Sequence, residues 1–245
     1  DYIHFINLKK YIIYIISFCF LVLIPIFSHA QKKPQIENLP KYDQKPYHFG
    51  FLLAGNKMDF IIKPNRNFHA SDSLLVLESE PQLGFNIGIV SNLRLGTYTD
   101  LRFLPTLSFG ERILEYTIKA DSSISSLTTK KIESTYLDFP LLFKYKSKRL
   151  NNVRSYIVGG IQYSLDLASQ AKKKQNNLEL VRIKSNDIMC QIGIGFDFYT
   201  EYFKFATEIK MSYGLKDLIV RDNTILTNSI ERLNSKIFQL SFLFE

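Results

Sequence analysis

The stretch Tyr136-Leu137-Asp138-Phe139-Pro140-Leu141-Leu142-Phe143-Lys144-Tyr145 decides the fold of this chain. Its odd-numbered positions are all apolar or aromatic, whereas Asp138, Pro140 and Lys144 share the other side with Tyr136 and Leu142. A period of two predicts a β-strand with two unlike faces. In a soluble sandwich the apolar face enters a core, whereas in a membrane barrel it faces lipid and the polar face lines the lumen.

Seven further stretches show the same alternation, so the chain is predicted to contain eight strands. The seven begin near Tyr47, Leu83, Leu101, Ile157, Ile188, Phe203 and Phe238. Long polar segments end at Gln82 or occupy Arg112–Ser134, Ser169–Asn186 and Leu215–Ser235, and short connections alternate with them. Short turns at one end and long loops at the other are typical of outer-membrane barrels, and strands of about 9–11 residues suit a tilted crossing. The sequence predicts an all-β fold, an eight-stranded antiparallel up-and-down transmembrane β-barrel over residues 47–245.

The predicted inward faces carry equal numbers of basic and acidic side chains: Arg102, Lys144, Lys204 and Lys210 with Asp138, Asp166, Asp197 and Glu208. The apolar faces are expected to carry no basic residue, because one near the membrane midplane would cost about 2–4 kcal/mol. Eight strands leave room only for side chains, so we expect these charges to pair as a polar plug of the lumen. Inward glycines are expected to make room for the lysine and arginine stems: Gly50, Gly84, Gly88, Gly160, Gly193 and Gly195.

The front of the chain predicts export. Lys9 and Lys10 precede an apolar run over 11–27, which ends in Ser28-His29-Ala30. These parts predict a signal peptide over residues 1–30, cleaved after Ala30. An uncleaved transmembrane anchor is the alternative, since about 17 apolar residues lie at the short limit for spanning. Residues 31–46, with three prolines among charged residues, are predicted to form an extended periplasmic linker.

Composition excludes several function classes. The net charge of +8 is spread along the chain, and such a charge suits acidic lipid headgroups or an acidic partner. The sequence contains no nucleic-acid-binding motif. Cys190 alone would remain after cleavage, so no internal disulfide is expected.

Few residues are candidates for chemistry or partner binding. No histidine pair has metal-ligand spacing, and no cofactor motif is present. A hydrolytic site would need His48 or His69 beside a serine and a carboxylate; an inward residue of the barrel and a loop residue are the plainer interpretations. Lys172, Lys173 and Lys174 are candidates for docking an acidic partner or lipopolysaccharide, or form an ordinary solvated loop.

Two stretches resemble a known family. Tyr136–Tyr145 is similar to the Y-L-E-I-P-L-L-L-K-Y strand of a large family of small outer-membrane barrels in Bacteroidota. Leu101-Arg102-Phe103-Leu104-Pro105-Thr106-Leu107-Ser108-Phe109-Gly110 resembles the preceding strand, and Gly193-Ile194-Gly195 the sixth. Within this family the length, the Leu-Arg-Phe-Leu-Pro form and the proline-rich segment most resemble the PorT group of the type IX secretion system and gliding motility. Glu245 after Phe244 departs from the usual aromatic terminus.

The resemblance implies a non-enzymatic outer-membrane scaffold for other secretion proteins, with both termini in the periplasm, no cofactor and no small-molecule substrate. Two alternatives remain open. A passive structural or adhesive barrel would have no role in secretion, and a barrel enzyme acting on lipid or peptide would depend on His48 or His69.

Overall fold

A computed structural model of the chain describes residues 37–65, 74–120, 124–167, 183–221 and 230–245. They form a short 3₁₀-helix, η2 (Tyr42–Gln44), and nine strands. The strands are β1 (Tyr47–Pro64), β2 (Leu74–Arg94), β3 (Thr99–Phe103), β4 (Thr106–Ala120), β5 (Ile124–Lys146), β6 (Val153–Asp166), β7 (Asn186–Tyr199), β8 (Lys204–Gly214) and β9 (Ile230–Phe244). Within these ranges no helix has the length and hydropathy needed to cross a membrane. The predicted signal peptide, His69 and the three lysines at 172–174 lie outside the described residues.

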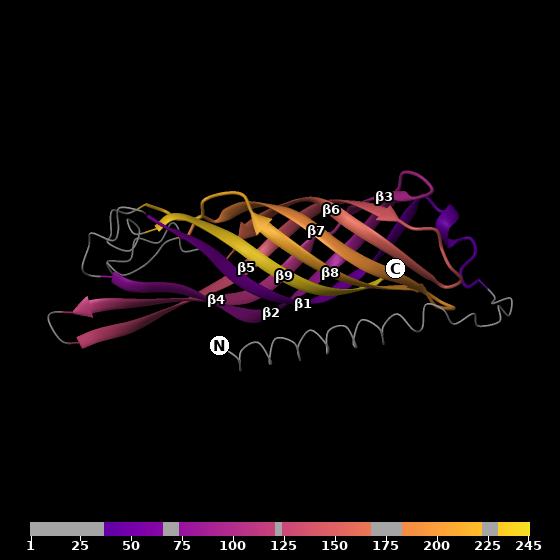
Figure 1. Cartoon of the computed structure of the whole chain (residues 1–245). Coiled ribbons are helices and arrows are strands. Elements are labelled where there is room, and N and C mark those ends of the chain that lie inside the picture. Colours follow the sequence, from indigo (N-terminus) through magenta and orange to yellow (C-terminus); the bar gives the residue numbers. More distant parts are fainter. Residues whose placement is uncertain (1–36, 66–73, 121–123, 168–182, 222–229) are drawn as a thin grey trace, which may run out of the picture. The chain divides into compact units, whose positions relative to one another are not determined.

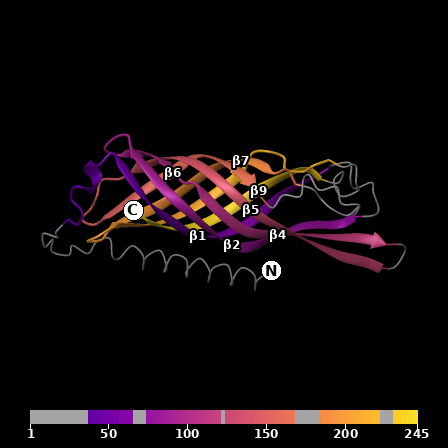
Figure 2. The ribbon, with the colours of Figure 1, turned by 180° about the vertical axis from the view of Figure 1, so that it is seen from behind.

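The nine strands form one closed antiparallel sheet (Figure 1). The sheet has eight strand positions around the ring, which we call staves. β3 and β4 are two halves of one stave, because both pair with β2 on one side and with β5 on the other. Their break falls at Pro105, which has no N–H to donate but whose carbonyl accepts from the Ile89 N–H at 2.9 Å. β1 pairs with both β2 and β9, which closes the ring, seen from behind in Figure 2. The prediction of an eight-stranded antiparallel up-and-down barrel is confirmed.

Side chains alternate between the outside of the ring and its lumen. Along β7 every second residue from Asp187 to Asp197 is buried, and those between them point outward. On β5, Phe143 and Tyr145 are about half exposed, whereas Lys144 between them is fully buried. The outside therefore carries an apolar band and the lumen carries the charges, which reverses the pattern of a soluble protein.

Three of the predicted long polar segments are partly strand, and one of them is Leu215–Ser235, because β9 begins at Ile230. β4 and β5 stay paired as far as Ala120 opposite Ile124, and their joined ends project beyond the neighbouring strands (Figures 1 and 2). β1 likewise continues to Pro64, and β2 begins at Leu74 instead of near Leu83. Alternating hydrophobicity ends where the apolar band ends, but the backbone hydrogen bonds of a sheet need no apolar face in water. The period of two therefore located the band, not the ends of the strands.

The expectation that the outward faces carry no basic residue is also wrong. Lys57 is exposed on the same face of β1 as Phe51 and Leu53. Lys236 lies on the outward row of β9, with its Nζ 5.1 Å from the centroid of the Phe238 ring. Both mark the edge of the apolar band on the side of the long loops, where a lysine stem can lie along apolar surface while its ammonium group reaches water.

Candidate functional site: the lumen of the barrel

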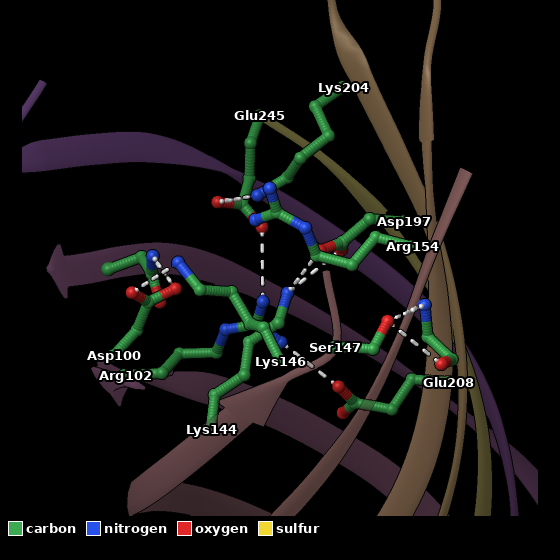
Figure 3. A network of polar contacts seen from close by, with 12 residues as sticks. Asp100, Arg102, Lys144, Lys146, Ser147, Arg154, Asp197, Lys204, Glu208 and Glu245 are labelled. Atoms are coloured by element: carbon green, nitrogen blue, oxygen red, sulfur yellow. Dashed lines mark hydrogen bonds and ion pairs between the residues drawn. The ribbon is translucent and has the colours of Figure 1, made fainter. Parts of the chain in front are cut away.

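A network of buried ion pairs occupies the lumen toward the short-turn end (Figure 3). Arg102 of β3 contacts two carboxylates, with Nη1 2.9 Å from Glu208 Oε2 and Nη2 3.3 Å from Glu245 Oε1. Lys204 Nζ lies 2.9 Å from the other oxygen of Glu245, and Lys210 Nζ lies 3.1 Å from Glu208 Oε1. Each of these two carboxylates is thus shared between two cations, as buried charges require.

A second pair lies beside this group. Lys144 Nζ is 2.8 Å from both carboxylate oxygens of Asp197, and it also lies 3.6 Å from the centroid of the Tyr156 ring. The Arg102 guanidinium lies 5.5 Å from the same centroid, so the electron-rich Tyr156 ring forms cation–π contacts with both cations. Gly195 faces this ring closely, since a Cβ there would lie 2.4 Å from Tyr156 Cζ.

The structure buries all eight charged residues predicted for the lumen and joins six of them in these pairs. Asp138 is not among the six. Its carboxylate accepts hydrogen bonds from Ser108 Oγ and Ser164 Oγ, both at 2.6 Å, and no basic side chain of the described residues lies within ion-pair distance of it. Asp166 is buried on β6, opposite Tyr136 of β5.

The lumen also holds charged residues that the sequence does not predict to face inward. Glu245 continues the inward row of β9, because Phe244 and Phe242 belong to the outward row, so extending the period by one residue would have found it. Lys146 Nζ pairs with Asp100 Oδ1 at 2.7 Å, and both sit where a strand meets a short turn.

Residues 37–46, the cap segment, lie against the short-turn end of the lumen. The Tyr42 ring stacks on His48 with centroids 4.1 Å apart. Arg154 Nη1 donates to Asp43 Oδ1 at 3.0 Å, and Tyr199 OH donates to the same oxygen at 3.1 Å. Burial raises the pKa of Asp43, but the hydrogen bonds and charge of Arg154 outweigh burial and hold that pKa below its ordinary value.

The predicted extended linker over residues 31–46 is wrong for its described part, the cap segment, because hydrogen bonds hold that segment against the barrel. The Asn38 backbone N–H donates to Asn152 Oδ1 at 2.9 Å, and the Asn38 side-chain amide donates to the Tyr199 carbonyl at 3.0 Å. Arg149 Nη2 donates to the Asn38 carbonyl. Polar residues of the short turns thus hold the cap segment, which the proline content alone does not reveal.

Apolar residues close the lumen toward the long-loop end. This apolar plug consists of Phe60, Leu114, Ile183, Leu218, Ile219, Ile230 and Leu233. Beneath it lies Arg112, fully buried, with its Cζ 4.4 Å from the centroid of the Phe60 ring and 5.1 Å from that of Tyr136. Arg112 Nη1 donates to Ser235 Oγ at 3.2 Å. The sequence predicts a loop at Arg112, so this inward position corrects that prediction.

His48, the candidate catalytic histidine among the described residues, has a backbone carbonyl as its hydrogen-bond partner, not a serine or a carboxylate. His48 Nε2 lies 2.8 Å from the Tyr42 carbonyl, so the histidine helps to hold the cap segment. Cys190 is exposed on the outward face of β7. Among the described residues no three side chains are arranged to hold a metal ion. Between the cap segment and the apolar plug, the lumen thus holds the ion pairs described above, together with Asp138 and Arg112, which form hydrogen bonds with serine hydroxyls.

Comparison with known proteins gives a family and several similar folds. A model described as the outer membrane protein beta-barrel domain matches residues 30–220. The solved structure of Neisserial surface protein A is 11% identical, covers 81% of this chain and 98% of its own, and has a TM-score of 0.41. The outer membrane protein OprG of Pseudomonas aeruginosa is 10% identical, with 82% and 95% covered and a TM-score of 0.38. The N-terminal β-barrel domain of Pseudomonas aeruginosa OprF is 13% identical, with 78% and 96% covered and a TM-score of 0.31. No curated protein matches the chain.

Proposed function

This chain belongs to the outer membrane protein beta-barrel domain family, and from that premise we propose that it is a non-enzymatic scaffold, fixed in the outer membrane by a closed barrel. The strands hold it in the bilayer, while the long-loop end and the chain preceding the cap segment bind other proteins. In this proposal the short turns, the cap segment and Glu245 lie in the periplasm, and the long loops lie at the cell surface.

The closure of the lumen carries the proposal. Arg102, Lys144, Lys204 and Lys210 have carboxylate partners in the same cross-section, so little of their charge is left for a passing solute. The cap segment covers one end and the apolar plug the other. A diffusion pore needs a continuous path of water, which an eight-stranded barrel filled by side chains does not offer.

Conductance measurements test closure directly. The full chain in a planar lipid bilayer is expected to give no steady ion conductance, whereas a porin under the same conditions gives stable open channels. A steady, voltage-independent conductance would show that the protein is a pore and would contradict the proposed closed scaffold.

We propose the type IX secretion and gliding machinery as the assembly that this scaffold serves. The support is the likeness of Tyr136–Tyr145 and Leu101–Gly110 to the PorT group of Bacteroidota. The three lysines at 172–174 and the chain from Gln31 are the proposed contacts for acidic partner surfaces.

A deletion strain tests this assignment. Loss of the gene should abolish release of type IX cargo and stop gliding, and a plasmid copy should restore both. Normal secretion combined with weaker envelope resistance or attachment would favour the alternative, a passive structural or adhesive barrel. Co-purification from outer membranes in mild detergent would identify the partners.

A further inference from the structure

Two lysines stand together on the outward face of the barrel, at the long-loop edge of the apolar band. In the β1–β9 register Lys57 lies opposite Phe238, and Lys236 lies opposite Asp59. The two lysines are therefore diagonal neighbours, whose positions in a sheet are roughly 7–8 Å apart. Their flexible ammonium ends can approach one phosphate group together. Neither lysine forms an ion pair with another described residue.

The outward row of β1 has a gap directly below Lys57. Gly55 lies between Phe85 of β2 and Leu240 of β9, and a Cβ placed on it would meet no atom within 4 Å. Phe85 is 53% exposed and Leu240 is 46% exposed, so both flank the gap as open apolar surface. An acyl chain is the partner that such a gap offers to a protein in a bilayer.

We propose that Lys57, Lys236 and the Gly55 gap bind one phosphorylated membrane lipid, with its phosphate between the lysines and an acyl chain in the gap. Nothing in the scaffold function requires this site. The nearest carboxylate in the register, Asp59, accepts hydrogen bonds from Ser79 Oγ at 2.7 Å and from the Phe60 N–H at 2.8 Å. The site therefore keeps a net charge of one positive unit, which favours an anionic headgroup over a zwitterionic one.

Native mass spectrometry of the folded full chain tests the headgroup. The protein is given phosphatidylglycerol and phosphatidylcholine with identical acyl chains, and the ratio of retained lipids is measured. Lys57→Gln/Lys236→Gln should lower the preference for phosphatidylglycerol at least about fivefold, since each basic residue near an anionic lipid contributes about 1 kcal/mol. The matched control is Lys45→Gln/Lys148→Gln, which neutralises two exposed lysines at the opposite rim and should keep the preference.

A second pair of variants tests the acyl chain. Gly55→Leu should lower retention of both lipids severalfold, whereas Gly159→Leu should not, although Gly159 is also an outward glycine, with Gln191 O as its nearest atom at 3.8 Å. Gly55→Ala serves if the leucine variant does not fold. The proposal is overturned if the Lys57/Lys236 variant behaves like its control. It is equally overturned if inorganic phosphate without an acyl chain is retained as strongly as phosphatidylglycerol, or if Gly55 and Gly159 variants lose lipid alike.

Discussion

Lys144 shows how far one buried charge depends on its partner. Its ammonium group is fully buried and lies 2.8 Å from both oxygens of Asp197. We expect Lys144→Met to lower the free energy of unfolding by about 3–5 kcal/mol, because the Asp197 carboxylate stays buried without its nearest cation. Lys144→Met/Asp197→Leu should recover most of this loss, since both charges are then gone.

Urea unfolding in lipid vesicles, followed by the gel mobility of unheated samples, measures these differences. The control is Lys63→Met, because Lys63 forms an ion pair with Glu231 in which both side chains are about half exposed or more, and such pairs contribute about 0–1 kcal/mol. A double variant as unstable as the single one would show that the ion pair is not what stabilises this part of the lumen.

Of the six glycines predicted to make room for basic stems, only Gly193 faces one. At Gly50, Gly84, Gly88 and Gly160 an added Cβ would instead meet a backbone carbonyl oxygen of the neighbouring stave, and Gly195 differs again. Gly193 does make room for a lysine stem, since a Cβ there would lie 2.7 Å from Lys210 Cγ. At Gly195 the added atom would meet the Tyr156 ring at 2.4 Å and the Thr207 carbonyl oxygen at 2.7 Å. Gly195→Ala should therefore cost about 1–3 kcal/mol of unfolding free energy.

Thermal unfolding of Gly195→Ala beside Gly55→Ala separates steric crowding from the general effect of adding a methyl group. Gly55 faces open space, so its variant should stay within about 0.5 kcal/mol of the parent. Equal losses at the two positions would mean that crowding against Tyr156 is unimportant.

The cap segment should detach from the barrel in acid. Asp43, paired with Arg154, has a pKa below its ordinary value, so the contribution of this pair is fully present above the unfolded-state pKa, about 3.9. It is lost as the pH falls through the lower folded-state pKa. A spin label on Lys41→Cys, in a chain whose native cysteines are replaced by serine, should stay immobile above about pH 4 and become mobile as the pH falls through the lowered folded-state pKa of Asp43.

Asp43→Asn removes the charge that Arg154 contacts, so it should leave the label mobile at every pH. Glu37→Gln is the matched control, because Glu37 is an exposed residue of the same segment, and it should preserve the acid transition. A label that stays immobile in Asp43→Asn would place the anchor elsewhere in the segment.

The barrel turns its apolar surface outward over all eight staves, so lysine substitutions on that surface report its solvent. Ile192, near the middle of β7, is 67% exposed, and Ile192→Lys should cost about 2–4 kcal/mol in a bilayer. Leu150, 71% exposed in a short turn, should accept lysine at about 0–1 kcal/mol. Urea midpoints in vesicles measure both. A harmless Ile192→Lys would mean that this surface does not face lipid.

Much of the fold follows from the sequence because a strand in a barrel has only two environments. Alternation along Tyr136–Tyr145 and its seven counterparts gives the number of staves and the face of each residue within those stretches, including the inward direction of Lys144. The same signal ends where both faces of a strand meet water. The sequence therefore predicts a loop where β4 and β5 continue and where Arg112 points into the lumen.

Only the tertiary structure decides which charges meet. Arg102 and Glu208 are 106 residues apart, and Arg102 and Glu245 are 143 apart, so no local spacing connects them. The closure of β1 on β9 and the stagger of the strands set which inward residues share a cross-section. The hold on the cap segment likewise depends on turns that are distant in sequence, such as the one that carries Asn152. Within the apolar band the sequence determines the direction of a side chain, because that is a property of one strand. The ring determines its partner, because that is a property of several strands together.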